Sequence, residues 1–431
     1  MSDSDRGPAM TTTAVGLCLL PAELLQEIFL RLALPDLFRL RSVSRDLGSL
    51  VSDGDFRRLY NLRSGRGCGW LFVYKKRPPR DSVLRGFNDR SGRWFHIPVA
   101  GILAPAVPPG EDLYFLAASG GLFLFASNGR RELLVVNLAT RAVRRIPPSP
   151  LGPRGTSSWR RAGLKLVADP YVADRFRFLF AEMVGNRPVL FEYRSDVDAW
   201  RAIQASEGPT GGGGVGGRDV CLNLVNIGGQ SVVLSCAGKG GGRGQRPAPV
   251  AHRPRFPEGF QWGPPVGMTT SDRFHVYGDG NVAVVRSAAA DVAGSGGGGS
   301  SSATTRARVV TSVQLLGLSE VGSEWELTST APAAVLEEAL RRRPYGVMMG
   351  CVVERDGVVG IVLMSNYRGS WGLSWLSYHR AQRKWACVPV PDCGTKGLNM
   401  AGIALSSTFS RSLWPSLCSS SSSSSPSEQA D

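Results

Sequence analysis

The chain has 431 residues, of which 42% are hydrophobic, and it contains 53 glycines and 28 prolines. A single core stops growing at roughly 250–300 residues, so we expect more than one core. The high glycine and proline content favours many turns and an all-β main domain. No stretch of about 18 apolar residues occurs, which argues against a membrane-spanning helix.

The net charge of +15 would suit an acidic partner such as nucleic acid. Six of the 50 positive residues are lysines, and the arginines are scattered along the chain rather than clustered. A general bias toward arginine and glycine accounts for this pattern about as well as a binding surface does. We therefore do not expect nucleic acid to be the main partner.

The eight cysteines form no CxxC pair and the four histidines are dispersed, so we expect no metal site, no catalytic cluster and no cofactor. Phosphate-binding loops, nucleophile elbows and HExxH motifs are also missing from the sequence. The start of the chain is acidic and polar and does not resemble a signal peptide. These features predict a non-catalytic protein of the nucleus, the cytoplasm or both.

The N-terminal part divides into two segments. Residues 1–16 are small and polar without periodicity, and we expect them to be disordered. Residues 17–62 predict a helical block, with a first helix from Pro21, a second from Pro35 and a short third one. A block of about 45 residues is at the lower limit for an independent core. It therefore either caps the main domain or leaves apolar surface for another protein.

Short apolar runs rich in Val, Phe, Tyr and Leu, each ending at Gly, Asn, Asp or Pro, predict β-strands over residues 67–410. Three glycine-rich segments, at 208–217, 238–259 and 293–302, are predicted to be insertions. The serine-rich tail, residues 411–431, is predicted to be disordered.

An aromatic or basic residue recurs before a short strand in the main domain: Trp94, Arg144, Trp200, Trp325 and Trp385. Most gaps are about 50–60 residues, a period that suits a propeller of four-stranded blades. The gap from Trp200 to Trp325 is about twice as long and contains the two Gly-rich insertions at 208–217 and 293–302. A further unit is therefore predicted there. We expect about five to seven blades.

The helical block, "LPAELLQEIFLRLALPDLFRLRSVSRDLGSLVSDGDF", resembles the F-box, whose pattern runs LPxELLxxIFxxLPxxDLxRLRxVCRxWRxLLSDPxF. The resemblance implies that this module docks on the Skp-type adaptor of a cullin–RING ubiquitin ligase. The adaptor-binding residues it implies are Leu20, Pro21, Leu24, Leu25, Ile28, Leu32, Pro35, Leu37, Leu40, Val43 and Leu47. Ser44 replaces a common Cys, and Leu47 replaces a common Trp, which removes aromatic area from the docking surface or from the third helix.

The phrases "SGGLFLF" and "VVNLATRAVRRIPP" resemble elements of plant F-box proteins with kelch-type C-terminal domains. The fold class expected from the whole chain is α+β multidomain: a small three-helix F-box followed by an all-β kelch-like propeller. The expected function is that of a substrate receptor that binds the adaptor and, through it, cullin and RING protein, and brings in a protein target for ubiquitination.

Two other functions remain open from the sequence. The first is an F-box-containing transcriptional co-regulator, in which the basic segment 238–259 would contact a transcription factor or nucleic acid. The second is an enzyme built on a propeller, which a metal analysis of the purified protein would test.

Overall fold

The structure is a computed structural model, and it forms two compact units, residues 1–64 and 65–431. The residues it describes are 20–32, 36–37, 40, 43–53, 55–56, 59–60, 69–76, 83–97, 99–138, 140–161, 163–169, 172, 174–207, 218–225, 231–237, 249–255, 283–293, 306–319, 323–341, 347–355, 357–367, 370–392 and 399–406. The predicted disordered ends, 1–16 and 411–431, lie outside these ranges. None of the described helices is long and apolar enough to cross a membrane.

Two helices are described in the first unit: α1 (Ala22–Phe29) and α3 (Arg45–Ser52). α1 begins at Ala22, and Pro21, predicted as the first helical residue, is its N-cap residue with φ −51° and ψ 145°. The predicted second helix from Pro35 falls largely outside the described residues, so the three-helix arrangement stays a prediction. The unit's core consists of Leu25, Phe29, Leu30, Leu37, Leu47, Val51, Phe56 and Tyr60.

The second unit is built of β-sheets, and the described residues form six of them; their strands pair antiparallel except for β12 and β15, which pair parallel. The first sheet has the strand order β23 (Asn399–Ser406), β1 (Trp70–Lys76), β2 (Val83–Asn88) and β3 (Arg93–Ile97). The second has the order β4 (Leu113–Ser119), β5 (Leu122–Ser127), β6 (Leu133–Asn137) and β7 (Ala142–Ile146). The third has the order β11 (Ala199–Gln204), β10 (Arg187–Arg194), β9 (Phe176–Val184) and β8 (Gly163–Ala168). The fourth sheet has the strand order β12 (Ser206–Glu207), β15 (Val250–His252), β14 (Ser231–Ala237) and β13 (Arg218–Val225). The fifth has the order β16 (Ala283–Ala293), β17 (Arg306–Leu318) and β18 (Trp325–Thr330). The sixth has the order β19 (Val347–Arg355), β20 (Val358–Tyr367), β21 (Ser370–His379) and β22 (Lys384–Val388).

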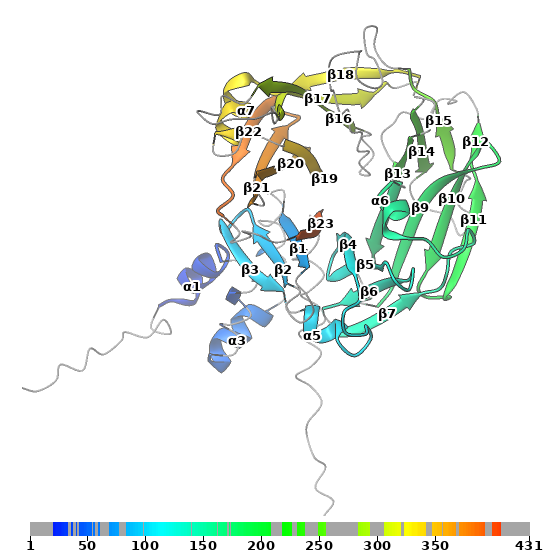
Figure 1. Ribbon diagram of the computed structural model, residues 1–431. Coiled ribbons are helices and arrows are strands. Elements are labelled where there is room, and N and C mark those ends of the chain that lie inside the picture. Colours follow the sequence, from blue (N-terminus) through cyan, green and yellow to red (C-terminus); the bar gives the residue numbers. More distant parts are fainter. Residues whose placement is uncertain are drawn as a thin grey trace, which may run out of the picture. The chain divides into compact units, whose positions relative to one another are not determined.

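The sheets are the blades of a propeller (Figure 1), and each contacts the next through its strands. β4 lies beside both β23 and β8, β13 lies beside β8 and β9, and β19 lies beside β17 and β23. The β15 and β18 sheets are joined at Arg255, whose carbonyl accepts a 2.8 Å hydrogen bond from the Trp325 backbone N–H. This agrees with the predicted propeller.

The first blade is completed by the end of the chain, because β23 pairs antiparallel with β1. Gly402 in β23 has a φ of +134°, which L-residues with a side chain rarely adopt. A Cβ atom at Gly402 would overlap the backbone carbonyl of Phe115 in β4. Glycine is therefore needed where the closing strand meets the next blade.

The predicted repeat occupies equivalent places in successive blades. Trp94, Trp200, Trp325 and Trp385 lie in β3, β11, β18 and β22, the last strands of four different blades. The long gap between Trp200 and Trp325 contains the β12–β15 sheet, so the predicted hidden unit is confirmed. In the second blade, the predicted repeat residue lies one position away from the residue that is equivalent in the structure. There the residue in register with the tryptophans is Val143, paired with Val136, and not Arg144.

Three of these tryptophans join neighbouring blades. The indole N–H of Trp94 donates to the Pro391 carbonyl at 2.9 Å, and that of Trp200 donates to the Pro147 carbonyl at 2.9 Å. Both carbonyls follow the last strand of the preceding blade. Trp385 likewise donates to the Ser329 hydroxyl in β18 at 2.8 Å. Three of the repeated tryptophans therefore form hydrogen bonds that join neighbouring blades, which we call the tryptophan joints.

Short helices occupy connections between blades: α5 (Val99–Leu103), α6 (Thr156–Arg161) and α7 (Ala333–Leu340). α7 buries Leu336 and Leu340, while Glu337 and Glu338 face solvent, as the amphipathic pattern predicts. One predicted insertion differs from the structure. Within segment 238–259, Val250–His252 forms strand β15, because it pairs with β14 on one side and β12 on the other. The segment 208–217 lies outside the described residues.

Candidate protein-docking site

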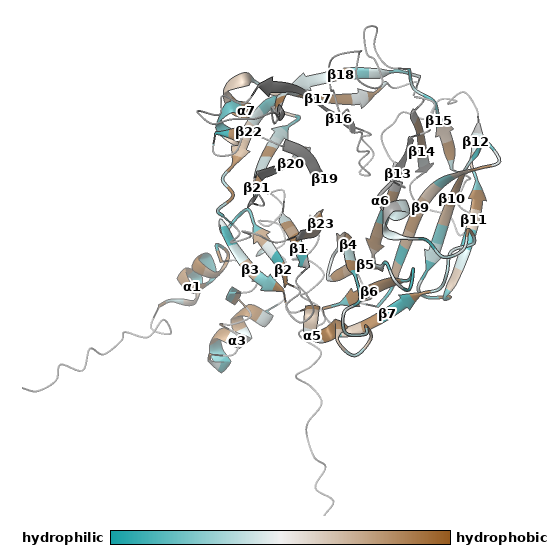
Figure 2. Ribbon diagram, in the orientation of Figure 1, coloured by the Kyte–Doolittle hydropathy of each residue, from teal (hydrophilic) through white to brown (hydrophobic). Residues whose placement is uncertain are grey.

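α1 contains several apolar residues, which colour parts of its ribbon brown in Figure 2. Leu25 and Phe29 point into the unit's core, where Phe29 is fully buried. Leu24 and Ile28, each one residue earlier, are 53% and 40% exposed. Residues four apart lie on the same side of a helix, so Leu24 and Ile28 form one exposed apolar stripe. An apolar stripe that is not used by the unit's own core is available to another protein.

Other predicted adaptor-binding residues are also exposed. Leu20 is 38% exposed and Val43 70%, and Pro21 is exposed as well. Leu32 and Leu40 are half-buried. We call Leu20, Pro21, Leu24, Ile28 and Val43 the exposed apolar set. Their contact with an adaptor remains a prediction.

Leu25, Leu37 and Leu47, also predicted to bind the adaptor, are at most 8% exposed and belong to the core of the first unit. A sequence stripe shows which residues are apolar but not which of two adjacent ones turns inward. In the free chain these three residues stabilise the unit and are not open to a partner. Pro35 lies outside the described residues.

The two departures from the F-box pattern have structural counterparts. The Ser44 hydroxyl accepts a 3.2 Å hydrogen bond from the backbone N–H of Leu47, which caps the start of α3. Leu47 is 4% exposed, so the aromatic area missing at this position is missing from the packing of α3. Of the two consequences considered from the sequence, the structure places the change in the helix packing.

Two aromatic residues of the first unit were not among the predicted site residues. Phe56 is fully buried, and its backbone N–H donates to the Asp53 carboxylate at 2.8 Å. Tyr60 packs near it, with ring centroids 6.2 Å apart, and donates its hydroxyl to the Leu32 carbonyl at 3.0 Å. The apolar spacing of Phe56, Leu59 and Tyr60 was the available signal for a further helical turn.

In the second unit, polar side chains join the second and third blades. Asp174 accepts hydrogen bonds from Asn137 at 2.9 Å and Thr140 at 3.2 Å, both on the second blade. Across the same joint, Arg144 pairs with Asp198 at 3.0 Å. These carboxylates are engaged by donors from the neighbouring blade, so the arrangement serves blade packing.

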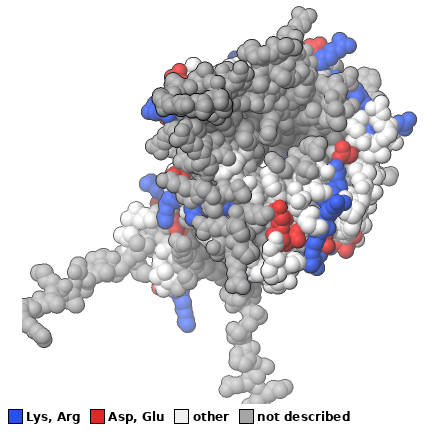
Figure 3. All heavy atoms as spheres, in the orientation of Figure 1, with Lys and Arg blue, Asp and Glu red and all other residues white. Residues whose placement is uncertain are grey.

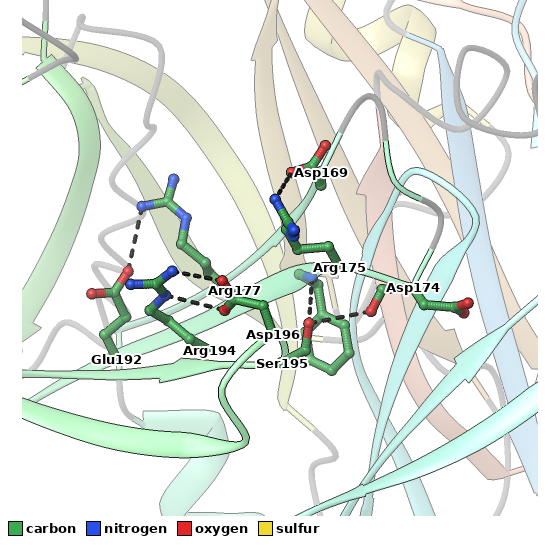
Figure 4. A network of polar contacts seen from close by, with 9 residues as sticks. Asp169, Asp174, Arg175, Arg177, Glu192, Arg194, Ser195 and Asp196 are labelled. Atoms are coloured by element: carbon green, nitrogen blue, oxygen red, sulfur yellow. Dashed lines mark hydrogen bonds and ion pairs between the residues drawn. The ribbon is translucent and has the colours of Figure 1, made fainter. Parts of the chain in front are cut away.

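The loops of the third blade are held by further pairs (Figure 4). Arg194 contacts Asp196 through two hydrogen bonds of 3.2 and 2.6 Å, and Arg177 lies 3.4 Å from Glu192. The Ser195 hydroxyl accepts from the Phe176 backbone N–H and donates to the Asp174 carbonyl. These hydrogen bonds and ion pairs join strands β9 and β10 to the turns beside them.

The pKa values of this joint follow from its contacts. Burial, and then the hydrogen bond to Asp198, raise the pKa of Tyr193 to about 12. The same hydrogen bond, followed by that from Arg144, lowers the pKa of Asp198. These shifts keep the Tyr193 hydroxyl protonated as a donor and Asp198 ionised as an acceptor.

Other reactive groups of the described residues do not gather into a site. No three His, Cys, Asp or Glu side chains in the described part of the chain come together as metal ligands. Cys351 is half-buried, and desolvation raises the pKa of its thiol. On the face in Figure 3, basic and acidic side chains lie near one another where the surface is described. The described groups therefore do not point to metal or thiolate chemistry.

The comparisons with known proteins agree with this picture. The F-box domain family matches residues 17–59. An F-box/kelch-repeat protein of Arabidopsis thaliana is 29% identical over 139 residues, which are 30% of this chain and 32% of the relative. F-box only protein 6 of Arabidopsis thaliana is 24% identical over 148 residues, 34% of this chain and 29% of the relative. The chain thus spans about a third of the length of each.

Likenesses to solved structures are weak. TolB from Acinetobacter baumannii has a TM-score of 0.33 and 10% identity, and the match covers 78% of this chain and 66% of TolB. The β-propeller domain of the Trilobed protease from Pyrococcus furiosus has a TM-score of 0.28 and 12% identity, with 70% and 81% covered. These TM-scores are too low to support a fold assignment, so the fold is assigned from the sheets described above. The chain thus combines a match to the F-box domain family at residues 17–59 with a β-propeller formed by the described strands of residues 65–431.

Proposed function

We propose that this protein is the substrate-receptor subunit of an SCF-type cullin–RING ubiquitin ligase, acting in the nucleus, the cytoplasm or both. Its first unit would dock on a Skp-type adaptor, which links it to cullin and RING protein. Its propeller would hold a protein target. The observation that carries the proposal is the exposed apolar stripe of Leu24 and Ile28 within the segment that matches the F-box.

The energetics of the stripe support docking. A fully exposed Leu or Ile gains roughly 1.5–3 kcal/mol on complete burial, so a half-exposed one gains about half of that. The exposed apolar set together therefore offers several kcal/mol to a partner that covers it. Burial of such side chains is the main favourable term in most protein associations.

The mechanism requires no bond chemistry from this chain. A receptor that holds a target beside a ubiquitin-loaded partner raises the effective concentration of the target's lysines. The propeller suits this role because its blades are fixed to one another by the tryptophan joints and by the closing strand, while loops vary without altering the blades.

The test is a pull-down with a purified Skp-type adaptor and the full chain carrying both Leu24→Asp and Ile28→Asp. We expect binding to fall to background, because covering the stripe would bury two unpaired carboxylates. Both side chains are exposed in the free chain, so the circular dichroism spectrum should not change.

The matched control is Val197→Asp, which places a carboxylate at a residue of the second unit that is 58% exposed. This variant should bind the adaptor like the unaltered chain. Undiminished binding by the double variant would contradict the proposal. If the double variant loses adaptor binding as expected, it should still hold targets without delivering them to the ligase. Affinity capture with this variant would therefore identify the target.

A further inference from the structure

Tyr60 lies one residue beyond the segment that matches the F-box, yet it belongs to the core of the first unit. The family match ends at residue 59. Tyr60 is 2% exposed, and its ring packs near Phe56. A buried tyrosine usually needs a partner for its hydroxyl.

That partner is the end of the α1 segment. The Tyr60 hydroxyl donates to the backbone carbonyl of Leu32 at 3.0 Å, across 28 residues of sequence. The chain leaves α1 through tight turns, with Arg31 N–H bonded to the Ile28 carbonyl and Leu32 N–H bonded to the Phe29 carbonyl. Leu32 lies three residues after the last residue of α1, and its backbone carbonyl receives its hydrogen bond from a distant side chain.

This bond bears on the exposed apolar stripe. Ile28 lies in the last turn of α1, four residues before Leu32, and it forms half of the stripe. The last turn of α1 contains no basic residue, and its C-cap residue, Leu30, contacts the helix through backbone hydrogen bonds. The tie to Tyr60 is therefore a specific restraint on the direction in which the end of α1 presents Ile28.

We infer that Tyr60 is a positioning residue for the docking surface, acting through the Leu32 carbonyl, so that the functional docking unit extends at least to residue 60. The inference rests on the proposed function. It predicts that loss of the hydroxyl weakens docking even when the unit is folded, because a loosened α1 end occupies the binding-competent orientation for less of the time.

The experiment measures the affinity of the full chain for a purified Skp-type adaptor at 10 °C by biolayer interferometry. Tyr60→Phe keeps the ring and removes only the hydroxyl. We expect affinity to fall about 3- to 10-fold, the size of one lost hydrogen bond. Thermal unfolding of the same variant shows whether the first unit is folded at 10 °C.

The low temperature separates positioning from general stability. If Tyr60 contributed only to stability, the folded fraction at 10 °C would stay near one and the affinity would equal that of the unaltered chain. Unchanged affinity at 10 °C would therefore overturn the inference. If the unaltered chain does not bind the adaptor either, the proposed function fails, and this inference fails with it.

Tyr193→Phe is the matched control. It also removes a tyrosine hydroxyl with a known acceptor, since Tyr193 donates to Asp198 at 2.5 Å, but in the second unit. This control should leave adaptor affinity unchanged. A fall equal to that of Tyr60→Phe would show that the loss is not specific to α1, and would overturn the inference.

Discussion

The two units of this protein use their apolar residues in opposite ways. The propeller pairs aromatic residues across strands, as with Tyr193 and Trp200 at 5.5 Å or Tyr378 and Trp385 at 5.0 Å, and its chain ends close into one blade. The F-box unit has a small core and leaves Leu24, Ile28 and Val43 at the surface. A closed ring can be stable by itself, whereas a small unit with exposed apolar side chains has surface that a partner could cover.

The largest expected effect is in the F-box unit. Phe29→Ala removes a fully buried ring, which costs about 3–5 kcal/mol and leaves a unit of this size little or no stability. Hydrogen–deuterium exchange should show loss of protection in peptides from residues 20–60 and normal protection in the propeller.

Its control is the preceding residue of the helix. Ile28→Ala, on the exposed stripe, should cost less than about 1 kcal/mol and leave exchange nearly unchanged. Equal losses from the two substitutions would mean that α1 does not have one buried and one exposed apolar face.

The next effect concerns closure of the ring. Gly402→Ala places a Cβ atom against the Phe115 carbonyl and forces a positive φ on alanine, with an expected cost of about 2–4 kcal/mol. Denaturant unfolding of the propeller measures this loss. Gly92→Ala is the control, because Gly92 also has a positive φ but has open space around it. It should cost about 1 kcal/mol, and a loss as large as that of Gly402→Ala would argue against the close approach.

A smaller effect is expected at a joint between blades. Trp200→Phe removes the indole N–H that bonds the Pro147 carbonyl, at a cost of about 1–2 kcal/mol. Trp159→Phe is the control, since the indole nitrogen of Trp159 is buried without a hydrogen-bond partner among the described residues. The free energy of unfolding should fall less in the control, and the reverse order would show that the joint contributes no stability.

The next effect is the loss of stability expected when the N-cap residue of α3 is replaced. Ser44→Ala should lower the stability of the F-box unit by about 1 kcal/mol, because the Leu47 N–H loses its acceptor. Ser44→Asp keeps an acceptor and should retain most of this stability. Ser44→Cys, which restores the residue common in the family, is expected to behave like alanine because sulfur is a weak acceptor. Melting of the F-box unit compares the three, and a loss with aspartate as large as with alanine would contradict the capping role.

Different parts of the two units were predictable from sequence for different physical reasons. The F-box was predictable because its determinants lie within about 40 contiguous residues. The propeller was predictable from the tryptophan period, including the blade hidden between Trp200 and Trp325. The pairing of β23 with β1 was not, because strands more than 300 residues apart carry no shared local pattern. Which of Leu24 and Leu25 is buried depends on tertiary packing, which periodicity alone does not determine.

The smallest effect is a pH dependence confined to the propeller. The pKa of Tyr193 is raised from 10 to about 12, so the folded state holds a proton that the unfolded state has lost between these values. The stability from this group is fully present below pH 10 and is lost as pH rises toward 12. Tyr193→Phe should remove this part of the decline while leaving the F-box unit, which lacks the Asp198 contact, unaffected. If unfolding of the unaltered propeller and of the phenylalanine variant showed the same slope from pH 10 to 12, the hydrogen bond between Tyr193 and Asp198 would not form within the third blade in solution.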